Sequence, residues 1–123
     1  MTPADIDALL DDGPSRELDD AIYALFKPGW AARAAEIGFR ASDNYTTSVD
    51  ACLRLIAERF EGWEWELELN LDECVVSGIN KDFFDVRNDT GHSLEVDRVK
   101  APSPALAMCR AIVAANRARE GER

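Results

Sequence analysis

Apolar and polar residues alternate along one stretch of the chain, residues 62–73. The apolar positions are Trp63, Trp65, Leu67, Leu69 and Leu71, and the polar positions between them are Glu64, Glu66, Glu68 and Asn70. Successive side chains of a β-strand point to opposite faces, so this pattern predicts a strand with one apolar and one acidic face. We expect Trp63, Trp65 and Leu67 to anchor the packing of the apolar face, because burial of each large side chain contributes roughly 1.5–3 kcal/mol.

Three shorter strands are predicted after this one, over residues 74–79, 83–87 and 94–99. Residues that favour turns separate them, such as Asn80-Lys81 after the first and the run 88–91 after the second. Connections as short as these favour antiparallel pairing of neighbouring strands. We therefore expect a four-stranded antiparallel meander.

Helical patterns lie on both sides of the predicted strands. Capping residues and prolines mark helix starts at Thr2-Pro3, at Ser15, at Thr47 or Ser48, and at Ser103-Pro104. Residues 27–29 end the second helix, and residues 31–37 are compatible with a further short helix. The apolar positions at helical spacing are Val49, Cys52, Leu53, Ile56 and Phe60 in the helix before the strands, and Ala105, Met108, Cys109, Ile112 and Val113 in the last helix.

The order of these elements indicates a single α+β domain over residues 1–123, of the form α-α-α-β-β-β-β-α. Residues 1–45 would hold the N-terminal helices and a loop, and residues 46–119 a helix–sheet–helix core. Residues 120–123 would form a frayed tail. In this arrangement the helices before and after the strands pack on one face of the sheet.

Acidic residues are concentrated in the segment that is predicted to form the sheet. The chain has 14 basic and 24 acidic residues and a net charge of −10. Residues 61–97 hold eleven acidic side chains and two basic ones. A protein with this balance repels nucleic acid and anionic membranes and favours basic partners.

A simple meander would gather six carboxylates on one face of the sheet, with Arg87 as the evident basic neighbour. These candidate partner-binding residues are Glu64, Glu66, Glu68, Asp85, Glu95 and Asp97. Like charges on neighbouring strands are destabilising, which favours a functional role in binding a basic protein. The alternative is an outer face that is acidic for solubility alone.

The cysteines and the histidine point away from a metal site. Cys52, Cys74 and Cys109 are far apart and lie within apolar patterns, and His92 is the single histidine. No C-x-x-C pair is present, so zinc is not expected, nor is any other cofactor. We expect free, buried thiols in a reducing cytosol. The first residues do not form a signal peptide, and no apolar run has the length of a membrane span, so we expect a cytoplasmic protein.

Paired carboxylates can also serve general acid–base chemistry or bind a hard metal ion. Here they lie on a predicted strand without a nucleophile or a glycine-rich loop beside them. We therefore expect a protein that is not an enzyme.

Four stretches of the chain, residues 13–19, 45–51, 61–65 and 103–109, resemble the phage ABA sandwich domain family. These stretches hold helix caps and packing faces, so the resemblance bears on fold more than on function. It implies a small phage or prophage protein with helices on both sides of the sheet, and it carries no activity, cofactor or active site. Residues 72–100 contribute little to it.

Together these observations predict a binding protein of phage or prophage origin in the cytoplasm of a bacterial host. Its partner would be a basic host protein, and its acidic sheet face would occupy a nucleic-acid-binding surface, as in an anti-CRISPR-like counter-defence inhibitor. Two alternatives remain open: a structural or assembly accessory of the virion, and a small enzyme.

Overall fold

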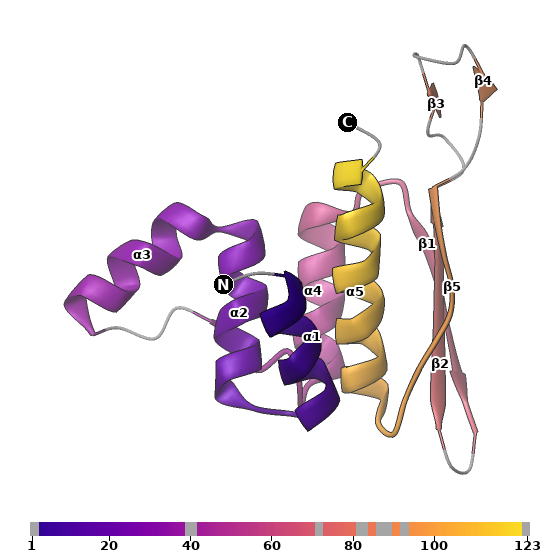
Figure 1. Cartoon of the computed structure of the whole chain (residues 1–123). Helices are drawn as coiled ribbons and strands as arrows, with labels where there is room; N and C mark the ends of the chain where they lie inside the picture. Colours follow the sequence, from indigo (N-terminus) through magenta and orange to yellow (C-terminus); the bar gives the residue numbers. More distant parts are fainter. Residues whose placement is uncertain are drawn as a thin grey trace.

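The computed structural model describes residues 3–38, 42–70, 73–80, 84–85, 90–91 and 94–121. Helices and strands roughly follow the expected order, with helices first, then the strands and then a last helix (Figure 1). Four helices precede the strands where three were expected, because the segment after Lys27 forms a helix of its own. The helices are α1 (Pro3–Asp12), α2 (Arg16–Phe26), α3 (Pro28–Ile37), α4 (Val49–Arg59) and α5 (Pro104–Gly121). The strands are β1 (Glu64–Leu69), β2 (Cys74–Asn80), β3 (Phe84–Asp85), β4 (Thr90–Gly91) and β5 (Leu94–Ala101).

The α+β fold with antiparallel strands is confirmed, and the structure shows how the strands divide. β1, β2 and β5 form a three-stranded sheet in the order β1-β2-β5. β3 pairs with β4 in a separate two-stranded ribbon. The chain therefore leaves the sheet after β2 and returns to it with β5. β5 pairs with the edge of β2 that β1 leaves free, because β5 is a longer partner than β3.

A β-bulge in β5 shifts the register of the sheet. Val76 pairs with Val99 and Gly78 pairs with Val96, so two residues of β5 lie opposite Ser77. One of them, Arg98, has a φ of +48°. Its backbone N–H donates a hydrogen bond to Ser77 Oγ at 3.1 Å. The bulge lets Val96 and Val99 occupy the same face although they are three residues apart.

Three predicted helix caps are present in the structure. The hydroxyls of Ser15, Ser48 and Ser103 accept hydrogen bonds from backbone N–H groups three residues along the chain, at 3.0, 3.2 and 3.3 Å. Pro28 has two effects, because it cannot continue α2 and its fixed φ favours the first turn of α3. The expected cap at Thr2 lies outside the described residues.

All five helices lie on one side of the three-stranded sheet (Figure 1). α5 packs against β5 and β2, and α4 packs against α5. Helix α5 is therefore buried on several sides, and the predicted core residues from Ala105 to Val113 are inside. For the described residues this is the one-sided arrangement that the sequence pattern predicts. The helices on both sides that the family resemblance implies are not seen among them.

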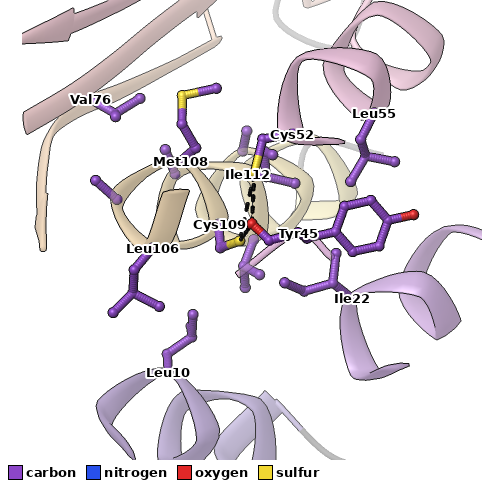
Figure 2. Packing of buried hydrophobic residues seen from close by; sticks show 14 of the residues in the cluster. Leu10, Ile22, Tyr45, Cys52, Leu55, Val76, Leu106, Met108, Cys109 and Ile112 are labelled. Atoms are coloured by element: carbon purple, nitrogen blue, oxygen red, sulfur yellow. Dashed lines mark hydrogen bonds between the residues drawn. The ribbon is translucent and has the colours of Figure 1, made fainter. Parts of the chain in front are cut away.

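The centre of the core joins α4, α5 and the turn before α4. Figure 2 shows Cys52 and Cys109 directed toward the carbonyl oxygen of Tyr45. Their Sγ atoms lie 3.1 and 3.2 Å from that oxygen and 3.8 Å from each other. Cys74 is buried in β2, and all three cysteines are free thiols. The prediction of buried, unbridged cysteines is confirmed.

A buried carboxylate fixes the same turn to α2. Asp19 and Thr46 are 4% and 1% exposed. The backbone N–H of Thr46 donates to Asp19 Oδ1 at 2.8 Å, and the Thr46 hydroxyl lies 3.4 Å from the carbonyl oxygen of Ser15. This contact holds the start of α4 against the start of α2.

Three residues predicted to face the core are exposed instead. Leu53 in α4 is 47% exposed, because α4 turns Cys52, Leu55 and Ile56 inward and leaves Leu53 on its outer side. Leu67 and Leu69 in β1 are 38% and 66% exposed, because α5 lies against β2 and β5 and does not reach over this part of β1. Trp63 and Trp65 do pack against the core, where their rings stack at 5.5 Å and both contact Phe60 edge-on.

Candidate functional site

The candidate site is the face of the three-stranded sheet that points away from the helices, which we call the outer face. In β1, Trp65 belongs to the core-facing side, so Glu64, Glu66 and Glu68 point outward, and all three are exposed. Their partners on β2 are Ile79, Ser77 and Val75. The predicted orientation of the three glutamates is therefore the one that the structure shows.

Strand β5 adds a fourth carboxylate to this face. Ile79 pairs with Glu64 on one side and with Glu95 on the other, so the two glutamates flank Ile79 in one row across the sheet. Glu95 is exposed. Asp97 lies in β5 next to the bulge, and the direction of its side chain lies outside what the structure describes.

The place of Asp85 differs from the prediction. It lies in β3, which pairs with β4, so it is not in the sheet that holds Glu64 and Glu95. A simple meander would need β3 to pair with β2, and β5 takes that position instead. Arg87 and His92 lie outside the described residues. The outer face therefore holds Glu64, Glu66, Glu68 and Glu95, without Asp85.

Basic side chains meet this face at one end. Arg98 Nη1 lies 3.5 Å from Glu68 Oε2, and Lys100 Nζ lies 3.6 Å from Glu73 Oε1. Val75 lies between Glu68 and Lys100 in the register and is only 2% exposed. Within the described part of the chain, no basic side chain pairs with Glu66 or Glu95.

Sequence reasoning missed the role of Arg98. Strict alternation from Val96 places Arg98 on the core side, and the bulge turns it outward. The signal was present in the chain, because two charged residues between Val96 and Val99 break the period of two.

A shallow hollow of about 460 Å³ lies on the sheet at the acidic end. Its lining includes three glutamates and one basic residue, with residues of β2 between them: Glu64, Glu66, Glu95 and Arg98, and Ser77, Gly78 and Ile79. On the opposite, core-facing side of β2, Gly78 leaves room for the ring of Trp65. A Cβ on Gly78 would be 2.7 Å from two carbons of that ring. This hollow can receive a basic or polar group, and its carboxylates are open to water.

The described residues contain no group of three histidine, cysteine or acidic side chains placed to hold a metal ion. Among the helices that the structure describes, none has the length and apolar character to cross a membrane.

The arginines of α5 hold the helices together. Arg110 donates to the carbonyl oxygens of Leu10 and Lys100 at 3.2 and 3.0 Å. Arg117 Nη1 lies 2.8 Å from Asp7 Oδ1, which ties α5 to α1. Arg119 donates to the carbonyl oxygen of Arg59 at 2.7 Å and lies over the ring of Phe60. These contacts turn the arginines toward neighbouring elements of the protein, and they form no patch for phosphate.

Comparisons of the chain with family models, with curated proteins and with solved structures find no match.

Proposed function

We propose that this chain is a non-enzymatic binding protein whose outer face docks on a basic protein surface. The observation that carries the proposal is the position of Glu64, Glu66, Glu68 and Glu95 on the side of the sheet that no described helix covers. Three of these carboxylates alternate along β1, and that of Glu95 lies across β2 from them, so together they make this face negative. A basic partner gains from complementary charge.

The proposal also includes a biological setting. The four stretches that resemble the phage ABA sandwich domain family favour a phage or prophage protein. A negative face that competes for a nucleic-acid-binding surface suits a counter-defence inhibitor of a bacterial host protein. The open, water-exposed hollow favours binding over catalysis, because enzyme sites enclose their reacting groups and exclude water.

The test compares two variants that each lose three negative charges. The first replaces Glu64, Glu66 and Glu68 by Gln on the outer face. The matched control replaces Asp12 by Asn and Glu17 and Glu36 by Gln, which are exposed residues of the helices. Both variants should fold like wild type by circular dichroism. Proteins captured by wild type from bacterial lysate at low and high salt then serve as partners in binding assays.

We expect the outer-face variant to associate with the captured partner about tenfold more slowly, because complementary fields steer encounter. The control variant should associate at the wild-type rate, added salt should slow wild-type association, and nucleic acid should compete for the partner. Equal association by both variants would refute the proposal.

A structural or assembly accessory is a second candidate, because large apolar side chains are exposed on α3. Trp30 and Ile37 are 67% and 70% exposed. Such side chains favour self-association. Sedimentation of wild type and of Trp30→Ala over a range of concentrations separates the two candidates. A wild-type oligomer that the substitution dissociates would favour assembly, and a monomer at every concentration would favour the binding protein.

A further inference from the structure

β1 is an edge strand, and no element within the described residues covers its edge. In the order β1-β2-β5, β1 pairs with β2 alone among the described strands. Natural proteins block such edges with charged side chains, most of all lysine, with proline, with bulges or with a covering element. β5, at the other edge, has a bulge and Lys100, whereas β1 reads Glu-Trp-Glu-Leu-Glu-Leu and pairs with β2 in unbroken register.

The hairpin contact identifies which backbone groups of β1 face the open edge. The N–H of Asn70 donates to the carbonyl oxygen of Glu73 at 3.0 Å, so Asn70 belongs to a hydrogen-bonded pair. Such pairs alternate along an antiparallel ladder. The N–H and C=O groups of Glu64, Glu66 and Glu68 therefore point to β2. The N–H and C=O groups of Trp65, Leu67 and Leu69 point to the open edge of β1.

The same end of β1 exposes apolar side chains. Leu67 and Leu69 are 38% and 66% exposed, whereas their partners on β2, Val76 and Cys74, are buried. These leucines belong to the apolar face of the sheet, at the point where the helices stop covering it. A strand added beside β1 would extend this face and cover both leucines.

We propose that the open edge of β1 accepts an extended segment of the basic partner, in which basic and apolar side chains alternate. The inference rests on the proposed function and deepens it, since it names the form in which the partner binds. Basic side chains of the segment would lie beside Glu66 and Glu68, and apolar ones beside Leu67 and Leu69. A second copy of β1 fits poorly, because antiparallel pairing would place glutamates beside glutamates. The binding mode is addition of a strand to a sheet edge.

The first test uses the full chain and a synthetic peptide of alternating lysine and valine, as long as the six residues of β1. A peptide of the same composition, with its lysines grouped in one block, keeps the charge and loses the alternation. We expect the alternating peptide to bind more tightly. It should slow amide hydrogen exchange at Trp65, Leu67 and Leu69. Exchange at Glu64, Glu66 and Glu68 should change little, because these amides already donate to β2.

A proline substitution tests the edge directly. The N–H of Leu67 does not point to β2, so Leu67→Pro keeps the β1–β2 ladder and removes a donor from the open edge. We expect Leu67→Pro to weaken binding of the alternating peptide by about tenfold. The peptide loses one net hydrogen bond and cannot approach β1 as closely. Leu67→Ala keeps the N–H group and serves as the control, with a smaller effect. If Leu67→Pro does not fold, N-methylation of alternate peptide residues tests the same pairing on wild type.

The variants separate failure of the edge from failure of the proposed function. If Leu67→Pro or the N-methylated peptide binds as wild type does while the triple Gln variant on the outer face binds weakly, the edge inference is wrong and charge-driven binding stands. If the triple Gln variant also binds normally, both are wrong. Equal binding of the alternating and the block peptide would also overturn the proposed occupant, the alternating segment of the partner. So would a wild-type dimer that Leu67→Pro dissociates.

Discussion

The ring of Trp65 occupies the space that a Cβ on Gly78 would take. The two residues are direct cross-strand partners in β1 and β2, and a Cβ on Gly78 would lie 2.7 Å from Cε3 and Cζ3 of the indole. The glycine thus lets the ring lie flat against β2, where it stacks with Trp63 and meets Phe60. The packing of β1 on the core depends on this contact.

Gly78→Ala should therefore lower the free energy of unfolding by about 1–3 kcal/mol, as expected for overpacking. Tryptophan fluorescence should change as Trp65 moves. Gly29→Ala is the matched control, because Gly29 lies in α3 with no atom within 4 Å of its added Cβ. That change should be neutral or stabilise by up to about 1 kcal/mol. Urea denaturation of both variants checks the difference, and equal stabilities would contradict the role of Trp65.

Asp19→Ala should destabilise the protein by about 1–3 kcal/mol, because it leaves the buried N–H of Thr46 without its acceptor at 2.8 Å. Asp19→Asn keeps a side-chain carbonyl at this position and should lose less. Chemical denaturation of the two variants measures both effects. An Asp19→Ala variant as stable as wild type would show that Thr46 finds another acceptor.

The native thiols should react with a thiol reagent about a hundredfold more slowly than in the unfolded chain, because reaction requires local opening. Hydrogen bonding with Cys52 and burial raise the pKa of the Cys109 thiol, which reduces its reactive thiolate form. Leu53→Cys places a thiol on the exposed side of α4 and should react at the rate of free cysteine. Fast labelling of the wild-type protein would contradict the buried core.

Alkaline pH should destabilise the fold through Tyr45. Burial and the nearby charge of Asp43 raise the Tyr45 pKa from 10.0 to about 12. The folded state thus favours the neutral phenol, whose contribution is complete below pH 10 and is lost as the pH rises from 10 to 12. Tyr45→Phe cannot ionise and should show a shallower loss. Urea denaturation at several pH values gives the free energy of unfolding of wild type and of Tyr45→Phe. Parallel curves of this free energy against pH would exclude Tyr45 as the cause of the alkaline loss of stability.

Removal of divalent metal should leave the melting temperature unchanged, since the residues that the structure describes hold no cluster suited to a metal ion. Thermal unfolding with and without a chelator measures this. A sharp fall in the melting temperature with the chelator, restored by one metal ion, would reveal a site formed elsewhere in the chain.

Local signals in the sequence were sufficient to predict most of the helices and the orientation of β1. Ser15, Ser48 and Ser103 cap their helices through bonds to residues three positions away, so the neighbouring chain alone determines them. The outward direction of Glu64, Glu66 and Glu68 follows from the period of two, which is a property of any strand. The burial of the cysteines follows in the same way from the apolar patterns around them.

Only the tertiary structure decided which segments meet. That β5 replaces the expected strand containing Asp85 beside β2 depends on competition between distant segments for one sheet edge. The outward turn of Arg98 depends on the bulge, and the exposure of Leu67 depends on where α5 ends its contact with the sheet. A repeating pattern tells which residues share a face. Whether that face is covered is determined by contacts between residues far apart in the chain, and no local pattern contains them.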